Sequence, residues 1–97
     1  MGTFHHGKGD LHGITVVVDL KDSRLFVGRC DTVMPEGVVL LDADMHDEAV
    51  AADGTDPVPK ATYLENALKF GVWKKYDRIV VPTEDVLSVR RLGDLAH

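Results

Sequence analysis

Cysteine, aromatic residues and long apolar runs are all scarce in this chain of 97 residues. The single cysteine, Cys30, excludes a disulfide within the chain, and its apolar neighbours indicate a small buried side chain. No apolar run approaches the ~18 residues of a membrane-spanning helix, and the first residues lack the pattern of a secretory signal. We therefore expect a soluble, cytoplasmic protein with no membrane partner. The formal net charge of −5 argues against a surface that is basic all over, although a local basic patch is compatible with it.

The length of the chain is that of a single domain. Glycine, histidine and polar residues dominate residues 1–12 and predict a flexible N-terminal arm, while residues 13–97 form the folded domain. The arm holds His5 and His6, with His12 at its end. Histidines can bind a metal, but a glycine-rich arm does not hold them in the fixed geometry that a metal needs, so we predict no metal site here.

Alternating apolar residues predict three consecutive antiparallel strands at residues 13–20, 24–31 and 38–45. Short polar or Pro- and Gly-containing segments separate these strands and favour tight turns. Gly28 lies inside the second strand, where a missing side chain permits a sharp bend or a close approach of another backbone. The three strands therefore predict a mainly β fold built on a small, strongly bent antiparallel sheet.

Residues 46–76 form an insertion that begins with an acidic, proline-containing loop at residues 46–59. One interpretation of the loop is a metal site, and the other is a solvated acidic segment. The candidate oxygen and imidazole ligands are Asp42, Asp44, His46, Asp47, Glu48 and Asp53. Their spacing is not that of an EF-hand loop, and acidic runs are usually solvated. We therefore favour the solvated segment.

The second part of the insertion predicts a short amphipathic helix at residues 63–70. Thr62 and Glu65 have the spacing of a capping box, and Gly71 is expected to end or loosen the helix. The apolar stripe of this helix consists of Leu64, Ala67, Leu68 and Val72. This stripe must cover another surface, for which an open end of the barrel and a neighbouring subunit are the two alternatives.

Basic and aromatic residues interleave at residues 73–76, Trp-Lys-Lys-Tyr. Aromatic rings can stack on nucleobases while lysines contact phosphates. Alternatively, Trp73 packs in the core and the lysines are ordinary surface residues, which is the more common situation for a tryptophan in a small domain. We favour the second interpretation.

The C-terminal part of the chain predicts two further strands at residues 78–81 and 86–92. The connection at residues 82–85 is short enough for one turn of 3₁₀ helix. The complete prediction is five antiparallel strands with one short helix inserted between the third and the fourth.

The short strands, the bend at Gly28 and the final strand–turn–strand resemble the Sm/LSm family, which includes the Hfq-like proteins. The residues similar to the first Sm motif are Val16, Val18, Leu20, Lys21, Asp22, Ser23, Arg24, Phe26, Gly28 and Cys30. The residues that keep the spacing of the second Sm motif are Val81, Val86 and Val89, with Pro82 and Thr83 where the family has Arg and Gly. The resemblance implies an Sm-like barrel whose helical insertion is longer than the usual loop at that place.

The resemblance also implies a homo-oligomeric ring of roughly five to eight subunits, in which the fourth strand of one subunit pairs with the fifth strand of the next. Pairing of this kind would remove two unpaired strand edges. The expected interface residues are Ile79, Val80, Val81, Val86, Leu87 and Val89.

Members of the family hold an RNA base between the loop after the second strand and the loop before the fifth. In this chain the corresponding segments, residues 34–37 and 82–83, have neither the family's Asn nor its Arg, and Glu36 adds a negative charge. The alternative left open is a different nucleic-acid surface, built from basic and aromatic residues together with Met34 of the first loop. The candidates are Arg29, Met34, Trp73, Lys74, Lys75, Tyr76 and Arg78.

The resemblance favours a non-catalytic ring that binds RNA or single-stranded DNA. The alternative is a ring-shaped scaffold or adaptor that binds a protein partner through its helix and acidic loop and has no role with nucleic acid. We do not expect an enzyme, because the sequence has no P-loop, dinucleotide-binding fingerprint or motif of a catalytic triad. No cofactor is predicted.

Overall fold

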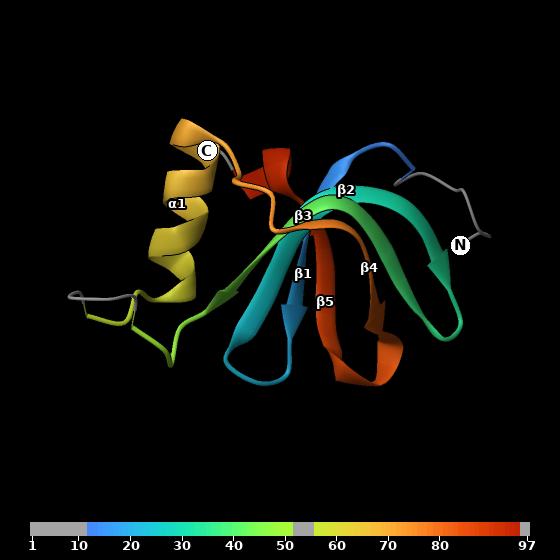
Figure 1. Cartoon of the computed structure of the whole chain (residues 1–97), viewed down its shortest axis with the longest axis horizontal. Helices are drawn as coiled ribbons and strands as arrows, with labels where there is room; N and C mark the ends of the chain where they lie inside the picture. Colours follow the sequence, from blue (N-terminus) through green and yellow to red (C-terminus); the bar gives the residue numbers. More distant parts are fainter. Residues whose placement is uncertain (1–11, 52–55, 96–97) are drawn as a thin grey trace.

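The structure, a computed structural model, describes residues 12–51 and 56–95 (Figure 1). The predicted N-terminal arm lies outside these residues, apart from His12. Three candidate metal ligands, His5, His6 and Asp53, also lie outside the described residues. In the part of the chain that is described, no helix is long and apolar enough to cross a bilayer.

Five antiparallel strands form one sheet in the order β4-β3-β2-β1-β5. This arrangement confirms the mainly β prediction, with five strands and one helix between the third and the fourth. Strands β4 and β5 are the two edges of the sheet. The elements in chain order are β1 (Thr15–Leu20), β2 (Arg24–Met34), β3 (Gly37–Asp47), α1 (Lys60–Phe70), β4 (Tyr76–Pro82), the 3₁₀ turn η1 (Thr83–Asp85), β5 (Val86–Arg91) and the 3₁₀ turn η2 (Leu92–Leu95).

The hairpin of β2 and β3 is longer than predicted at both ends. Pairing resumes after a register shift between Cys30 and Thr32 and continues to Met34 opposite Gly37. At the other end β3 includes His46, which the sequence pattern had placed in the acidic loop. Likewise β4 begins at Tyr76, two residues before the predicted start. The pattern made each of these strands too short, because polar residues near the strand ends broke the apolar alternation.

The sheet bends sharply at Gly28, as predicted. The register of β2 and β3 shifts between Val27 and Arg29, so that β3 carries an extra residue at this point. Asp42 adopts a left-handed backbone conformation there, with φ of 51°. A Cβ atom at Gly28 would lie 2.7 Å from Cβ of Ala43, which leaves no room for a side chain. Figure 1 shows β2 and β3 arching together over the rest of the sheet.

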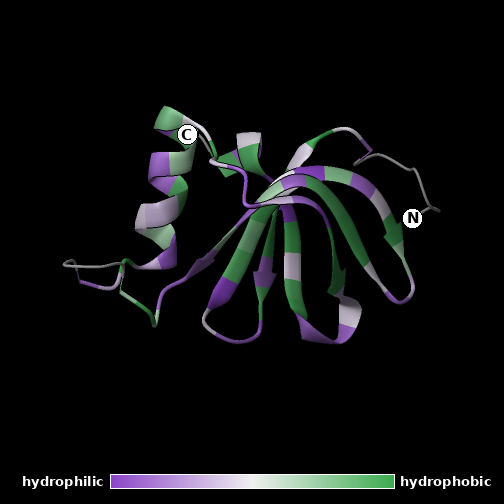
Figure 2. Cartoon of the chain, viewed as in Figure 1, coloured by the Kyte–Doolittle hydropathy of each residue, from purple (hydrophilic) through white to green (hydrophobic). Residues whose placement is uncertain are grey.

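The concave side of the bent sheet holds the main core. Cys30 is buried there, as predicted, and burial raises the pKa of its thiol. The buried members of this cluster are Val16, Val18, Leu20, Phe26, Cys30, Val38, Leu40, Ala43 and Val81. In Figure 2 the hydrophobic residues follow the strands, and the hydrophilic residues gather at the turns.

The other side of β1 and β2 carries a second, smaller core. Val17, Leu25 and Val27 are fully buried there. The residues that cover them are Tyr63, Leu64, Val72, Leu92 and Leu95, from α1, the segment after it and η2. Leu64 and Val72 of the predicted apolar stripe therefore pack on the second face of the helix's own sheet, a surface that neither sequence-based alternative named.

Helix α1 begins at Lys60, and the predicted capping box at Thr62 was wrong because Thr62 lies inside the helix. The free backbone N–H of Lys60 instead donates to Oε1 of Glu48, at 3.1 Å. The Lys60 ammonium lies 2.7 Å from Oδ1 of Asp19 and 2.8 Å from the carbonyl oxygen of Asp22. These contacts attach the start of α1 to the turn between β1 and β2. Gly71 ends the helix as predicted, with φ of 88°.

Candidate nucleic-acid interface

The two connections that the family resemblance associates with base binding lie side by side. The backbone N–H of Thr83, in η1, donates to the carbonyl oxygen of Glu36 in the β2–β3 turn, at 3.1 Å. Gly37 pairs with Pro82, and a Cβ on Gly37 would lie 2.8 Å from the carbonyl oxygen of Val81. Close backbone packing therefore holds the turn against the beginning of η1.

This edge of the molecule is acidic. The half-exposed Met34 ends β2, and the acidic residues beside it are Glu36, Glu84 and Asp85. Neither connection carries a lysine or an arginine. The two connections themselves therefore offer a phosphodiester carboxylates and no cation. The β1–β2 turn, which carries Lys21 and Arg24, borders η1, because the backbone N–H of Lys21 donates to the carbonyl oxygen of Asp85 at 2.9 Å.

A cluster of charged residues lies where β2, β3 and β4 run side by side. Arg29 is opposite Leu41, and Leu41 is opposite Arg78, so the three side chains emerge on one face of the sheet. Nη1 of Arg29 lies 3.2 Å from Oδ2 of Asp42. Nζ of Lys74 lies 3.7 Å from Oδ1 of the same carboxylate. The structure thus pairs two of the predicted basic residues, Arg29 and Lys74, with one aspartate at the bulge, and Arg78 lies on the same face of the sheet opposite Leu41.

Lys74 also pairs with Asp77, at 2.8 Å. The hydrogen bond between them raises the pKa of Lys74 and lowers the pKa of Asp77. Both groups therefore stay charged at neutral pH. The side chain of Asp77 is 89% exposed, so a phosphate can compete with it for Lys74.

Lys75 points to a different part of the molecule from Lys74. Its ammonium donates to the carbonyl oxygen of Met45, at 3.2 Å, and lies 3.7 Å from Oδ1 of Asp44. Asp44 is buried and also accepts a hydrogen bond of 2.6 Å from the Tyr63 hydroxyl. Burial and this hydrogen bond raise the pKa of Tyr63. Lys75 therefore belongs to a network that joins β3 to α1.

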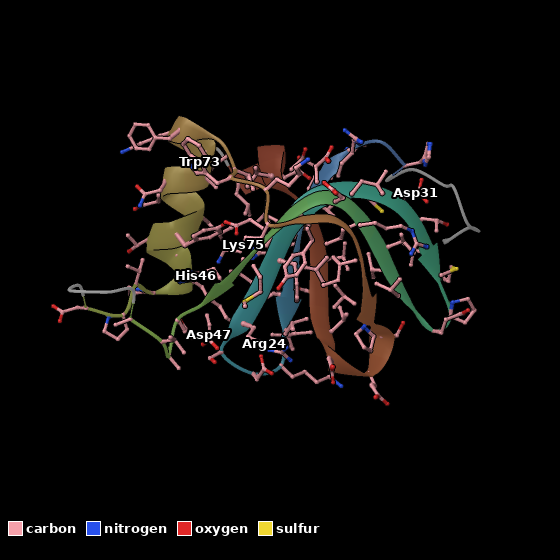
Figure 3. The ribbon with its side chains drawn as sticks, in the orientation of Figure 1. Arg24, Asp31, His46, Asp47, Trp73 and Lys75 are labelled. Carbon is pink, nitrogen blue, oxygen red and sulfur yellow. The ribbon has the colours of Figure 1, made fainter. Side chains whose placement is uncertain are left out.

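Trp73 is 82% exposed, so the expectation that it packs in the core was wrong. Its neighbour Val72 packs on the second core in its place. Tyr76 is half-buried against the main core, with its ring 6.2 Å from that of Phe26. The four interleaved residues therefore do not form one surface, and only Trp73 presents an open aromatic ring. Figure 3 places Trp73 near the end of α1, far from Arg24 at the β1–β2 turn.

The sequence pattern missed Phe70, which is 75% exposed at the last position of α1. A large apolar residue directly before Gly71 lies at a helix end, where the chain changes direction. Its position at the helix end and outside the apolar stripe was the sequence signal for its exposure.

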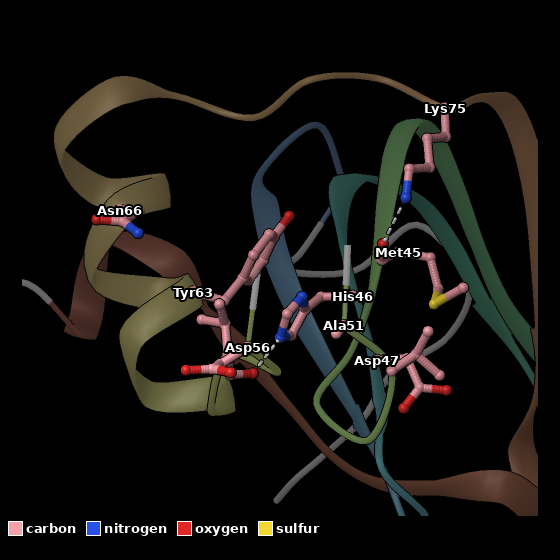
Figure 4. A pocket seen from close by; sticks show the side chains of 10 residues that line it. Met45, His46, Asp47, Ala51, Asp56, Tyr63, Asn66 and Lys75 are labelled. Carbon is pink, nitrogen blue, oxygen red and sulfur yellow. Dashed lines mark hydrogen bonds between the residues drawn. The ribbon is translucent and has the colours of Figure 1, made fainter. Parts of the chain in front are cut away.

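A pocket of about 470 Å³ lies between β3 and α1 (Figure 4). Its aromatic wall is formed by His46 and Tyr63, whose rings stack with centroids 4.5 Å apart. Nε2 of His46 lies 2.6 Å from the carbonyl oxygen of Val58. The lining residues are Met45, His46, Asp47, Val50, Ala51, Asp56, Val58, Tyr63, Asn66 and Lys75. Sequence patterns could not reveal this pocket, because its residues come from separate segments that meet only when α1 docks.

Part of the acidic run of the insertion has structural partners. Asp47 accepts a hydrogen bond of 2.6 Å from the Ser23 hydroxyl, which lowers the pKa of Asp47. Glu48 accepts the first N–H of α1. Among the described residues, no three His, Cys, Asp or Glu side chains gather as metal ligands would.

The predicted interface residues lie on the two edge strands. Val81 is buried in the main core, whereas Leu87 on β5 is 63% exposed and Val80 on β4 is 38% exposed. The others, Ile79, Val86 and Val89, are partly buried against the core. A strand-to-strand contact uses the unpaired backbone N–H and C=O groups of an edge strand, and both edges also carry an exposed apolar side chain that such a contact could cover.

Comparison with known proteins points to one architecture. No protein-family model matches the chain, and no curated protein matches its sequence. A similar solved structure is that of an Sm protein from Pyrococcus abyssii in complex with a uridine heptamer, with 27% sequence identity and a TM-score of 0.53. The match covers 84% of this chain and 86% of that one. The chain therefore has an Sm-like fold, with α1 as an insertion between β3 and β4.

Proposed function

We propose that this protein is a non-catalytic, homo-oligomeric ring that binds RNA or another single-stranded nucleic acid. The observation that carries this proposal is the structural similarity to an Sm protein that was solved with a uridine heptamer. The similarity extends over most of both chains. We take the binding of single-stranded RNA from that protein as the role of this one.

Ring formation is supported by the two open edges of the sheet. Strand β4 pairs with β3, and β5 pairs with β1. Head-to-tail pairing of β4 with β5 of the next subunit would satisfy both edges and close a ring if the rotation permits. Leu87 and Val80 would be covered in that contact.

Native mass spectrometry of the protein as purified, with and without nuclease, tests both parts of the proposal. We expect a closed ring of roughly five to eight subunits, with additional mass that nuclease removes. A monomer at micromolar concentration would contradict the ring, and a ring without bound nucleic acid at any salt concentration would contradict the proposed ligand.

A pair of matched variants tests the subunit contact. Leu87→Glu places a charge in the proposed interface, and Val50→Glu places one at an equally exposed position in the insertion, since both side chains belong to residues that are 63% exposed. We expect Leu87→Glu to dissociate the ring and Val50→Glu to preserve it. Equal behaviour of the two variants would show that β5 is not the contact.

A protein-binding scaffold is the second candidate. The observations that favour it are the net charge of −5 and the exposed Phe70 at the end of α1. In that case nucleic acid should bind only at low salt concentration, and a protein partner should protect α1 from hydrogen exchange.

A further inference from the structure

We propose that Trp73 is a stacking platform for an unpaired base of single-stranded nucleic acid, and that the basic residues around it hold the adjoining phosphates. This inference rests on the proposed function and locates a binding surface at the end of α1. The surface is separate from the acidic edge formed by the β2–β3 turn and η1.

The exposure of Trp73 is the first argument. A tryptophan in a small domain normally buries most of its area, yet this one is 82% exposed, and Phe70 beside it in sequence is 75% exposed. Two large aromatic side chains that stay in water add no burial to the stability of the fold, so their exposure leaves them available to a partner. Aromatic rings are also the groups on which unpaired bases stack.

The backbone around Trp73 is anchored on both sides. Val72 packs on the second core, which the sheet forms with α1 and η2. On the other side of Trp73, the backbone N–H of Lys75 donates to the carbonyl oxygen of Ala43 on β3, at 2.8 Å. The ring of Trp73 is therefore carried by a short segment with little freedom, and a base that stacks on it would order few additional groups.

Charge distribution is the third argument and decides which partner fits. The chain as a whole is acidic, but residues 69–78 contain four basic residues and one acidic residue. The basic residues are Lys69, Lys74, Lys75 and Arg78. Lys75 is engaged by Met45 and Asp44, so Lys69 and Lys74, the nearest in sequence of the remaining three, are the residues assigned to the phosphates. A strand of nucleic acid needs both cations for its phosphates and an aromatic face for its bases, and this segment supplies both within ten residues. An apolar protein groove would match Trp73 and Phe70 but not the lysines.

Trp73 is the only tryptophan of the chain, which gives a direct measurement. Its intrinsic fluorescence should be quenched as oligouridine is added to the intact protein, over the same concentrations at which a labelled oligouridine shows increased anisotropy. Trp73→Ala should weaken binding by about tenfold or more, whereas Trp73→Phe should retain most of the affinity because it keeps an aromatic face.

A charge-matched pair of variants tests the phosphate contacts. Lys69→Gln should lower the dependence of log K on log salt by about 0.7, as expected for one phosphate contact to a single strand. Lys21→Gln removes an exposed lysine from the β1–β2 turn and should leave the dependence unchanged.

The outcomes separate this inference from the proposed function. If oligouridine binds but neither quenches Trp73 nor loses affinity in Trp73→Ala, the platform is overturned and the nucleic-acid role stands. If the wild-type protein does not bind single-stranded RNA or DNA at low salt, the nucleic-acid role is overturned together with the platform. Quenching by a purified protein partner but not by nucleic acid would assign the same surface to protein docking and overturn the proposal.

Discussion

The hydroxyl of Tyr63 on α1 donates a hydrogen bond of 2.6 Å to the buried carboxylate of Asp44 on β3. Removing the hydroxyl by Tyr63→Phe would leave one carboxylate oxygen without this donor, at a cost of about 1–3 kcal/mol in the free energy of unfolding. For a domain of this size, each kcal/mol corresponds to a decrease of about 4–8 °C in Tm. Thermal unfolding at fixed protein concentration measures the effect, with Asn66→Ala at an exposed position of the same helix as control. An unchanged Tm in Tyr63→Phe would show that the hydrogen bond to Asp44 does not help to hold α1 on the sheet.

The raised pKa of Tyr63 predicts a loss of stability at alkaline pH. The folded protein keeps the phenol protonated above its ordinary pKa of 10.0, whereas the unfolded chain releases the proton there. The stabilising contribution is therefore complete below that pH and is lost as the pH rises above it. We expect the difference in Tm between wild type and Tyr63→Phe to shrink when unfolding is measured on the alkaline side of pH 10.0. A constant difference across this range would contradict the burial of the phenol.

The bend at Gly28 predicts a large effect for a small substitution. Gly28→Ala would place a methyl group 2.7 Å from Cβ of Ala43 and 3.2 Å from the carbonyl oxygen of Leu41. Overpacking of this kind costs about 1–3 kcal/mol, because β3 must move away from β2. The matched control is Gly93→Ala, where a Cβ would meet nothing within 4 Å. The urea midpoint of Gly28→Ala should therefore be lower than that of Gly93→Ala. Equal midpoints would show that the bulge in β3 can move to accommodate the methyl group.

The ion pair between Lys74 and Asp77 predicts a gain of nucleic-acid affinity on removal of a charge. Asp77→Asn would free Lys74 for phosphate and remove a carboxylate from the proposed surface. We expect single-stranded RNA to bind about 1.4- to fivefold more tightly, since an exposed pair of this kind is worth roughly 0.2–1 kcal/mol. Asp22→Asn is the control, because Asp22 pairs with Arg24 at 2.9 Å in the distant β1–β2 turn. Affinity is measured by fluorescence anisotropy of a labelled RNA. An equal gain in affinity for both variants would show that the change in net charge alone is responsible.

Much of the fold was predictable because its signals are local. The alternation of Val16 and Val18 with their neighbours predicts β1, and this period depends only on adjacent residues. Gly28 indicated the bend because no other residue type fits such a close approach. Gly71 likewise indicated the end of α1, since a left-handed C-terminal cap favours glycine.

The start of α1 was not predictable in this way. Its first N–H is satisfied by Glu48, twelve residues earlier in the chain, and not by a side chain of the helix's own first turn. The capping box at Thr62 and Glu65 was a valid local pattern. The helix nevertheless begins two residues earlier, at Lys60, because Lys60 contacts β1 and the β1–β2 turn. These contacts exist only once the helix has docked.

By itself, the amino-acid sequence determined the order of the strands and helix, the place of the bend and the buried state of Cys30. The tertiary structure alone decided that α1 covers the second face of β1 and β2, that Val72 and not Trp73 enters the core, and that Arg29 and Lys74 pair with Asp42. The physical reason is that periodicity specifies which residues share a face, whereas burial and charge pairing depend on which faces meet when the chain is packed.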